Sequence, residues 1–451
     1  MKTTGDDAGS LAVRGVSGMF RALAHRNFRL FWAGAFLSNV GTWMQTVAQS
    51  WLVLQLTNSP FWLGFDAFAA TAPGLVLTLL GGVFADLIDR KRLLLITQVG
   101  AGLTALILAG FIWAGALNSP GRVWIILIAS FITGCCMSLA APSYQAITID
   151  LVGREDLANA IALNSTQFQL SRVLGPALAG VAFNVFGLKG CFLANGLSYI
   201  AVVWALALVR FKPREAATTT ANDGDESIAV APTAVAAAAA TTAKRQGDDN
   251  KRHIWRDLTD GFRYVSKRPR VFMLLLISAV VSLFGAPYFS LVPLFARDIF
   301  HLGETGLALL MGAAGAGAFC AALLLAFLGD VRRKGWFVLG GAAMFSVCLI
   351  GFALSTVLAA TLAFLFCMGF AIVCSVAVTN ILLQQLVTDK MRGRVMSMFI
   401  LSFIGAMPIG SFLAGLGAEH FGAPHTLAAG GLVIFLFAAY TAARNPRLRA
   451  L

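Results

Sequence analysis

Twelve apolar segments, each long enough to cross a bilayer as a helix, constrain this chain more than any other feature of its sequence. They come as six segments, a polar gap at 211–270, and six more. Only helices and closed barrels satisfy their backbone hydrogen bonds inside lipid. The pattern therefore predicts an all-α membrane protein with twelve transmembrane helices in two pseudo-symmetric six-helix bundles. The expected spans lie at about 30–54, 61–85, 93–116, 122–146, 161–185, 190–210, 271–295, 304–328, 336–355, 358–382, 395–418 and 424–442.

The composition excludes the soluble classes. Hydrophobic residues make up 58% of the 451 positions and charged residues 12%, whereas a soluble domain carries about 25% charged residues. A soluble protein this apolar would expose large hydrophobic patches and aggregate. The seven cysteines lie in apolar segments without the spacing of a metal site, so we expect them to pack as small apolar side chains.

The net charge of +13 is explained by where the basic residues lie. Thirty of the 34 Lys and Arg fall on one side of the predicted spans, three fall on the other, and Arg172 lies within a span. Basic residues concentrate in the cytoplasmic loops of membrane proteins. We therefore expect a multi-pass protein of a bacterial-type inner (plasma) membrane with both termini in the cytoplasm, and no nucleic-acid partner.

The polar gap divides the chain into two membrane units. Residues 215–250 are rich in Ala, Thr, Asp and Gly, which predicts a disordered linker, and 253–267 carries apolar residues at the spacing of an amphipathic surface helix. The predicted organisation is a cytoplasmic tail with an interfacial helix at 1–29, a first bundle at 30–210, a cytoplasmic linker at 211–270, a second bundle at 271–442, and a cytoplasmic tail at 443–451.

The two units are related in sequence. At an offset of 235 residues, the fifth and sixth spans align without a gap to the eleventh and twelfth. Matching pairs include Gly175 with Gly410, Gly180 with Gly415, Phe186-Gly187 with Phe421-Gly422, and Gly196 with Gly431. Repeats of this kind, with six spans each, allow two halves to rock around a central site.

A short motif follows the second span. It reads Gly82-Val-Phe-Ala-Asp86, continues through Leu, Ile and Asp, and ends in Arg90-Lys91-Arg92. Together with two six-helix halves and a long linker, it resembles the major facilitator superfamily. The resemblance implies that fold and a conformational latch formed by Gly82, Asp86, Arg90 and Lys91, in which the Asp contacts a helix N-terminus and the basic cluster. The alternative is a positive-inside anchor with a helix cap.

A second segment is similar to the drug and siderophore exporter branch of that superfamily, which includes enterobactin-exporter-like and macrolide-efflux-like proteins. It reads LVGREDLANA at 151–160. Gly175, Pro176 and Gly180 of the fifth span are similar to the antiporter motif. The fourth span reads SFITG at 130–134, where many drug–proton antiporters carry an Arg.

Two charges fall inside predicted spans. Arg172 lies about 12 residues into the fifth span, and its counterpart in the repeat is Met407, so the repeated scaffold does not require a charge there. A charge at mid-membrane is a functional candidate by default; the alternative is a structural pair between helices. Asp66 lies near the outer end of the second span and is expected to carry protons. The alternative is a hydrated carboxylate near the interface.

Polar side chains lie along one face of the first span and recur elsewhere. A lipid-facing helix would not carry such a stripe, so these groups face protein or a water-filled cavity. Set among aromatic rings, they suit an amphipathic organic ligand, and the alternative is hydrogen bonding between helices. The predicted substrate cavity comprises Asn39, Trp43, Gln45, Gln49, Tyr144, Asn164, Gln167 and Asn380.

The sequence thus predicts a monomeric secondary active transporter, not an enzyme, which exports a small amphipathic, drug- or siderophore-like molecule by alternating access and proton antiport. Its partners would be that molecule, protons and membrane lipids. No Walker sequence is present, and no catalytic residue, metal or cofactor is expected. The alternatives are a facilitator or importer of a nutrient or lipid and, more distantly, a membrane enzyme or sensor, which the scattered positions of the five His disfavour.

Overall fold

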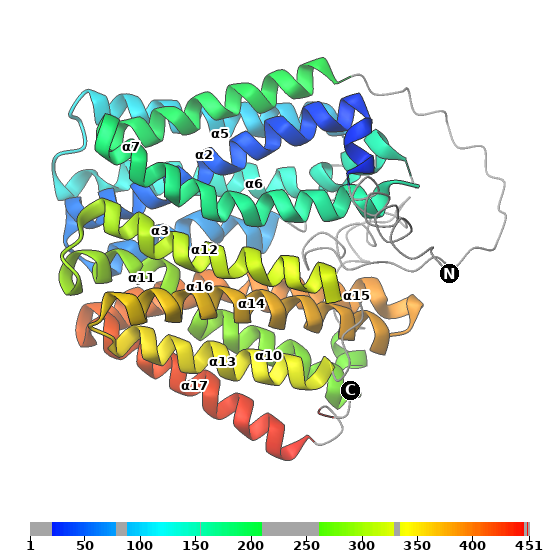
Figure 1. Ribbon diagram of the computed structural model, residues 1–451. Helices are drawn as coiled ribbons and strands as arrows, with labels where there is room; N and C mark the ends of the chain where they lie inside the picture. The colour runs from blue at the N-terminus through cyan, green and yellow to red at the C-terminus, as the bar shows by residue number, and fades with distance from the viewer. Residues whose placement is uncertain are drawn as a thin grey trace, which may run out of the picture.

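A computed structural model describes residues 20–77, 88–153, 155–209, 261–328, 334–445 and 449. The described residues are almost entirely helical, and none of them lies in a strand. The long helices lie side by side, with the first half of the chain above the second in Figure 1.

Helices of the first half begin and end where local chemistry dictates. Asn58 adopts a left-handed conformation (φ 50°) that ends α2, and Pro60 at the first position of α3 restarts the chain as a helix. The elements are η1 (Arg21–Ala24), α2 (Arg26–Thr57), α3 (Pro60–Thr71), α5 (Arg90–Trp113), η2 (Pro120–Arg122), α6 (Val123–Val152) and α7 (Leu157–Leu208).

Helices of the second half are interrupted more often. The prolines at 287 and 293 accompany the break between α10 and α11 and the π-helical turn η3. The elements are α10 (Pro269–Gly285), α11 (Tyr288–Leu294), η3 (Phe295–Ile299), α12 (Gly303–Leu328), α13 (Lys334–Leu354), α14 (Leu358–Leu386), α15 (Asp389–Ile404), α16 (Ala406–Phe421) and α17 (Ala423–Arg444).

The described helices account for twelve spans. Ten segments are long and apolar enough to cross a membrane. One of them, α7, contains a non-helical residue at Gly187 and therefore comprises two spans. The polar stripe lowers the hydropathy of α2, which is not among the ten although it has 32 residues. Ten segments, one more from the division of α7 and one from α2 make twelve, which confirms the predicted fold class.

The sequence repeat is also a structural repeat. Gly187 and Gly422, 235 positions apart, both have positive φ (65° and 81°) and both turn the chain between paired spans. Gly180 of α7 packs against Ala308 of α12, while Gly415 of α16 packs against Gly64 of α3. The two halves therefore contact each other through two equivalent pairs of helices, α7 with α12 and α16 with α3.

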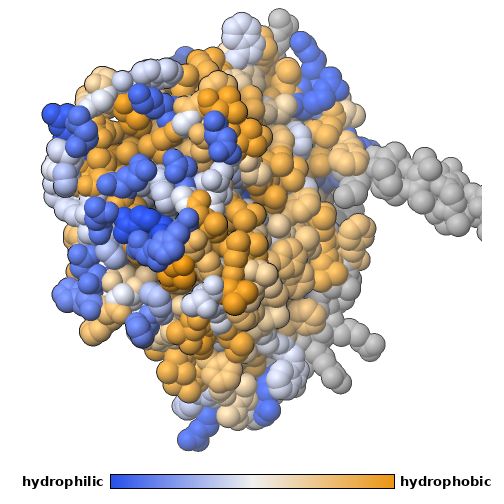
Figure 2. Space-filling model, turned by 60° about the vertical axis from the view of Figure 1, so that its left-hand side comes forward, coloured by the Kyte–Doolittle hydropathy of each residue, from blue (hydrophilic) through white to orange (hydrophobic). Residues whose placement is uncertain are grey.

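The ends and flanks of the bundle differ in polarity. We name the end at which α2, α5 and α10 begin the basic end, because it carries basic residues such as Arg26, Arg90 and Arg268, and the opposite end the far end. Figure 2, in which the far end comes forward, shows hydrophilic residues gathered there and hydrophobic residues over the flanks. Large hydrophobic side chains such as Ile107 of α5 and Trp204 of α7 are exposed, as a lipid-facing surface requires.

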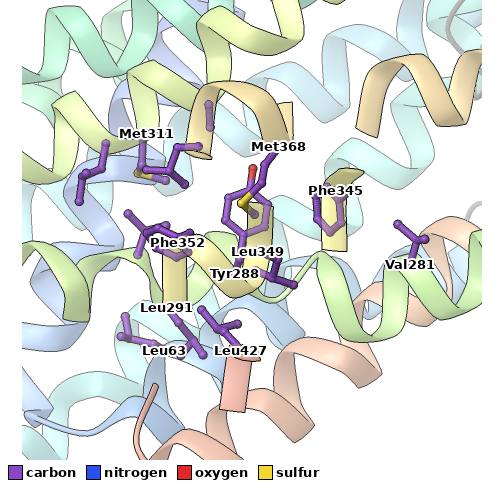
Figure 3. Close-up of a cluster of buried hydrophobic side chains, with 14 of the residues drawn as sticks. Leu63, Val281, Tyr288, Leu291, Met311, Phe345, Leu349, Phe352, Met368 and Leu427 are labelled. Atoms are coloured by element: carbon purple, nitrogen blue, oxygen red, sulfur yellow. The ribbon is translucent and has the colours of Figure 1, made fainter. Parts of the chain in front are cut away.

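A large apolar core fills the second half and reaches across to the first. In Figure 3 the Tyr288 ring lies beside Met368 and Leu349, while Leu63 of α3 lies near Leu291 and Leu427. Tyr288 is 5% exposed and its ring meets that of Phe345 edge to face. The core therefore holds α11 firmly at the junction of the halves.

Several predicted segments lie wholly or partly outside the described residues. These include most of the 1–29 tail and the 211–270 linker, and the tail at 443–451 apart from 443–445 and 449. Within them, η1 precedes α2 where the interfacial helix was expected, and residues 261–266 are helical at the end of the expected amphipathic helix. The domain boundaries remain predictions.

Candidate functional site

Asp66 forms the centre of a buried polar cluster in the first half. It lies on α3 about 9 Å from the far end, six residues after Pro60 at 1.5 Å each. Its carboxylate accepts hydrogen bonds from Gln49 Nε2, at 3.1 Å to Oδ1 and 3.0 Å to Oδ2, and from Ser130 Oγ at 2.5 Å. Asp66 is 9% exposed. Among the described residues, none forms an ion pair with it.

The cluster continues through the core of the first half. Gln45 Nε2 donates to Gln49 Oε1 at 3.3 Å, and Asn195 Nδ2 of α7 donates to Gln45 Oε1 at 2.6 Å. Amide side chains both donate and accept, so they connect Asp66 to the second part of α7 without a charge. We name Asn195, Gln45, Gln49, Asp66 and Ser130 the amide chain.

The second half has no equivalent of this carboxylate. The pairing of Gly64 with Gly415 and of Ala308 with Gly180 aligns α3 with α12 at an offset of 244 residues. Asp66 then corresponds to Leu310, which is fully buried. The acidic residue is therefore specific to the first half and is not a demand of the repeated helix packing.

A second cluster lies where the two halves meet. Arg172 of α7 is fifteen residues from both Leu157 and Gly187 and so lies near the middle of its span. Its Cζ is 5.3 Å from the centre of the Trp43 ring on α2, which is cation–π range. The Trp43 ring also meets Phe168 of α7 edge to face (6.2 Å, 68°) and Phe289 of α11 (5.6 Å, 82°). We name these four side chains the aromatic–Arg cluster.

The cluster contains residues of both halves and an unpaired charge. Tyr288 lies beside Phe289 on α11, and the two rings meet edge to face (6.1 Å, 90°). Among the residues the structure describes, none forms an ion pair or a hydrogen bond with the Arg172 guanidinium. Phe168 is 43% exposed although it lies at mid-membrane depth.

The predicted single cavity is thus divided between the faces of α2. Gln49 lies roughly 240° around the helix from Trp43 at 3.6 residues per turn. Gln45 and Gln49 therefore join the amide chain inside the first half, whereas Trp43 faces the junction. Asn39 is half-buried one turn before Trp43, and its side chain makes no hydrogen bond with another described residue.

Tyr144, Asn164 and Gln167 form a third group between α6 and α7. Gln167 Nε2 donates to the Tyr144 hydroxyl at 3.0 Å, and Asn164 Nδ2 donates to Thr148 Oγ1 at 3.2 Å. The side-chain oxygens of both amides are buried without a partner among the described residues. Asn380 lies apart from all three groups, fully buried on α14, where it accepts a hydrogen bond from Gln384.

The glycines of the antiporter-like motif serve close packing. A Cβ atom on Gly175 would collide with the Cβ of Trp43, so this glycine lets α7 approach α2 beneath the aromatic–Arg cluster. A Cβ atom added to Gly180 would lie 3.3 Å from the Cβ of Ala308 in the other half. Pro176 is buried within α7 between these two contacts.

The predicted latch is only partly within the described residues. Gly82 and Asp86 lie outside them. Arg90 pairs with Asp150 at 3.2 Å, and Lys91 Nζ donates to the carbonyl oxygens of Ala207 (3.3 Å) and Val209 (2.8 Å) at the end of α7. These contacts anchor α5 within the first half, and the latch remains a prediction.

Sequence reasoning missed three contributors. The sequence marks Ser130 only as a residue of the segment where many drug–proton antiporters carry an Arg, and it gives no role to Asn195 or Phe289. Asn195 is a polar residue in the sixth apolar span, a signal that could have been used. No sequence signal shows that Ser130 reaches Asp66 or that Phe289 reaches Trp43, since these contacts depend on helix packing.

The far end is closed by contacts between the halves. Glu419 Oε2 of α16 accepts hydrogen bonds from Ser59 Oγ (2.7 Å) and from the backbone N–H of Phe61 (3.2 Å). Arg297 Nη1 of η3 donates to Asn58 Oδ1 at 2.6 Å. We name these three hydrogen bonds the far-end contacts.

Comparison with known proteins gives the family. The sequence profile of transmembrane secretion effectors matches residues 17–223 and 225–450. The staphyloferrin A transporter of Staphylococcus aureus is 23% identical over 407 residues, covering 90% of this chain and 92% of that protein. Macrolide efflux protein A of Streptococcus pyogenes is 22% identical over 416 residues, covering 91% and 94%. An enterobactin exporter of Citrobacter koseri is 27% identical over 190 residues, covering 42% and 45%.

Solved structures agree on the fold. A bacterial homologue of the human lysosomal transporter Spinster, in an inward-facing and unoccupied conformation, matches with a TM-score of 0.64 at 15% identity, covering 92% of this chain and 95% of that one. A proton:xylose symporter of the major facilitator superfamily matches with a TM-score of 0.56 at 13% identity, covering 93% and 96%. The fold and the sequence profile define a multi-pass membrane transporter. The chain belongs to the transmembrane secretion effectors of the major facilitator superfamily, which confirms the resemblance.

Proposed function

We propose that this transporter exports a small amphipathic organic molecule by alternating access and that proton entry drives the export. The single observation that carries the coupling is the buried Asp66 carboxylate, which is held by Gln49 and Ser130 and has no cation paired with it among the described residues. A carboxylate taken out of water without a counter-ion favours proton uptake. Asp66 thereby supplies a site that can be loaded from the far side and emptied inside.

The orientation of the protein in the membrane follows from its two ends. The basic end lies in the cytoplasm by the positive-inside rule, which leaves the far end outside. The far-end contacts then close the outer side, and the relatives named for siderophore transport and macrolide efflux support export. Asp66, about 9 Å from the outer end, becomes accessible from outside when these contacts break.

Everted membrane vesicles test the proposal. A panel of fluorescent amphipathic dyes of either charge is offered to vesicles with and without the protein, and dye accumulation is followed while a proton gradient is imposed and then collapsed with an uncoupler. We expect accumulation of at least one dye to require both the protein and the gradient. Protein-dependent accumulation that an uncoupler leaves unchanged would exclude proton antiport, and outward dye movement would favour the importer alternative.

A further inference from the structure

We infer that the aromatic–Arg cluster is the recognition site of the transported molecule and that it selects an aromatic or planar organic anion, a carboxylate above all. This inference rests on the proposed export function and names its substrate class. The site combines a cation, Arg172, with the rings of Trp43, Phe168 and Phe289.

The unpaired charge is the first argument. Arg172 lies at the midpoint of its span and has no hydrogen-bond or ion-pair partner among the described residues. Arg172 is half-buried, and a cation at mid-membrane depth is unfavourable unless something neutralises it. Asp66 is the acid that lies inside a span in the described part of the chain, and its hydrogen bonds are to Gln49 and Ser130. The guanidinium therefore lacks a counter-ion that a substrate can provide.

The position of the site is the second argument. Arg172, Phe168 and Trp43 belong to the first half, whereas Phe289 belongs to α11 of the second. A ligand held between them touches both halves, so its binding energy differs between inward- and outward-open states. Coupling of a ligand to alternating access requires such a difference.

The repeat argues against a purely structural role for the charge. The counterpart of Arg172 is Met407, which occupies the equivalent place in α16 while the equivalent glycines make equivalent contacts. A flexible apolar side chain is therefore sufficient for the packing at this position. The backbone of α7 at Arg172 is already fixed by Gly315 of α12, which packs directly against the Arg172 carbonyl.

The geometry of the groups defines the ligand chemistry. A guanidinium has a planar set of donors that matches a carboxylate with two parallel hydrogen bonds. The edge-to-face rings beside it offer apolar area to an aromatic or conjugated body. A cationic amphipath would find the same rings, but Arg172 would repel it.

Two ligands with the same ring and opposite charge provide the test. Anthracene-9-carboxylate and anthracen-9-ylmethylammonium are titrated against the purified full-length protein in detergent, with ring fluorescence as the signal. We expect the carboxylate to bind at least about tenfold more tightly, since hydrogen bonds to a charged group are among the strongest. Acetate lacks the ring, so we expect it to displace anthracene-9-carboxylate only at about hundredfold higher concentration than the anthracene ligand itself.

Variants assign the preference to Arg172. Arg172→Met introduces the residue that the repeat already accommodates and should weaken carboxylate binding about tenfold or more without weakening the ammonium. Arg172→Lys should retain part of the preference. Lys189→Met removes the same charge at an exposed far-end position and should leave both affinities unchanged.

Three outcomes would overturn the inference. The first is equal affinity of the wild-type protein for the two anthracenes. The second is displacement of anthracene-9-carboxylate by acetate at a similar concentration. The third is carboxylate binding that survives Arg172→Met. The first two need no variant, so they decide the matter even if Arg172→Met does not fold. Binding in detergent requires no gradient. A carboxylate preference without export would therefore refute the proposed function alone, and dye export without that preference would refute this inference alone.

Discussion

Gly64 of α3 and Gly415 of α16 meet backbone to backbone across the junction of the halves, with a Cβ atom added to Gly64 lying 2.7 Å from the Cα of Gly415. Above this contact, Phe412 packs on Phe61, Phe65 and Phe68 of α3. The two helices can approach this closely only because neither residue has a side chain.

Gly64→Ala should therefore favour the state that is open at the far end, because the added methyl group separates the helices. A cysteine at Phe412 reports the change, and we expect its reaction with a membrane-impermeant maleimide to accelerate several-fold. Gly312→Ala is the matched control, since a Cβ at Gly312 meets nothing within 4 Å. Equal labelling of the two variants would contradict a role for this contact in closure.

Glu419→Ala should also favour the state that is open at the far end, because it removes hydrogen bonds between the halves. It removes the acceptor of the hydrogen bonds from Ser59 and from the Phe61 N–H. Because these bonds are exposed, we expect a shift between conformations and no measurable loss of folding stability. Maleimide labelling at position 412 and thermal unfolding in detergent measure the two quantities, and a large fall in unfolding temperature would show a structural role instead.

Asp66→Asn should abolish the dependence of export on the proton gradient. The amide keeps hydrogen-bonding capacity towards Ser130 but cannot release a proton. Substrate binding in detergent should stay within about threefold of wild type, because Asp66 is not part of the aromatic–Arg cluster. Asp389→Asn, an exposed acid at the start of α15, serves as the control. Gradient-driven accumulation that survives Asp66→Asn would remove this residue from the coupling mechanism.

Gln45→Leu should impair transport by breaking the amide chain in its middle. It leaves Gln49 Oε1 and Asn195 Nδ2 without their partners, and each buried polar group left unpaired costs about 1–3 kcal/mol. We expect slower gradient-driven export together with lower thermal stability. Adding Asn195→Leu, which removes the orphaned amide, should recover stability but not export. If the double variant recovers both thermal stability and export, the amide chain has only a structural role.

Gly315→Ala should destabilise the protein by about 1–3 kcal/mol, because its Cβ would collide with the backbone carbonyl of Arg172, which cannot move aside. Gly312→Ala, three residues earlier in α12, should be neutral or slightly stabilising, since Ala has the better helix propensity. Thermal unfolding of the two variants in the same detergent makes the comparison. A smaller loss at 315 than at 312 would contradict the packing of α7 on α12.

The sequence predicted the element order because hydrophobic length is a one-dimensional property. Each expected span overlaps at least one described helix, and the expected span 61–85 extends into residues outside those the structure describes. The repeat was equally visible, since Gly187 and Gly422 need positive φ and glycine supplies it. The fifth and sixth predicted spans both lie in α7, and Gly187, whose φ and ψ are not helical, divides it into two.

The sequence predicted several residues of the candidate site, such as Asp66 and Arg172, but it did not predict how the site residues are arranged. The pattern of α2 identified its polar face and Trp43 together, yet it could not show that Gln49 turns to Asp66 while Trp43 turns to Phe289. That division depends on which helices pack on each side of α2, and Asn380, expected in the same cavity, lies in the core of the other half.

By itself the sequence determined the number of spans and the rarity of charge within the membrane, since both are set by the cost of placing a residue in lipid. It also showed the repeat, through matching residues such as Gly187 and Gly422. Tertiary structure alone decided that Asp66 is held by Ser130 and that Arg172 lies among rings of both halves, without an ion-pair partner in the described part of the chain. These relationships arise from helices that glycine contacts bring together. Residues far apart in the chain become neighbours only through such packing, which no local pattern encodes.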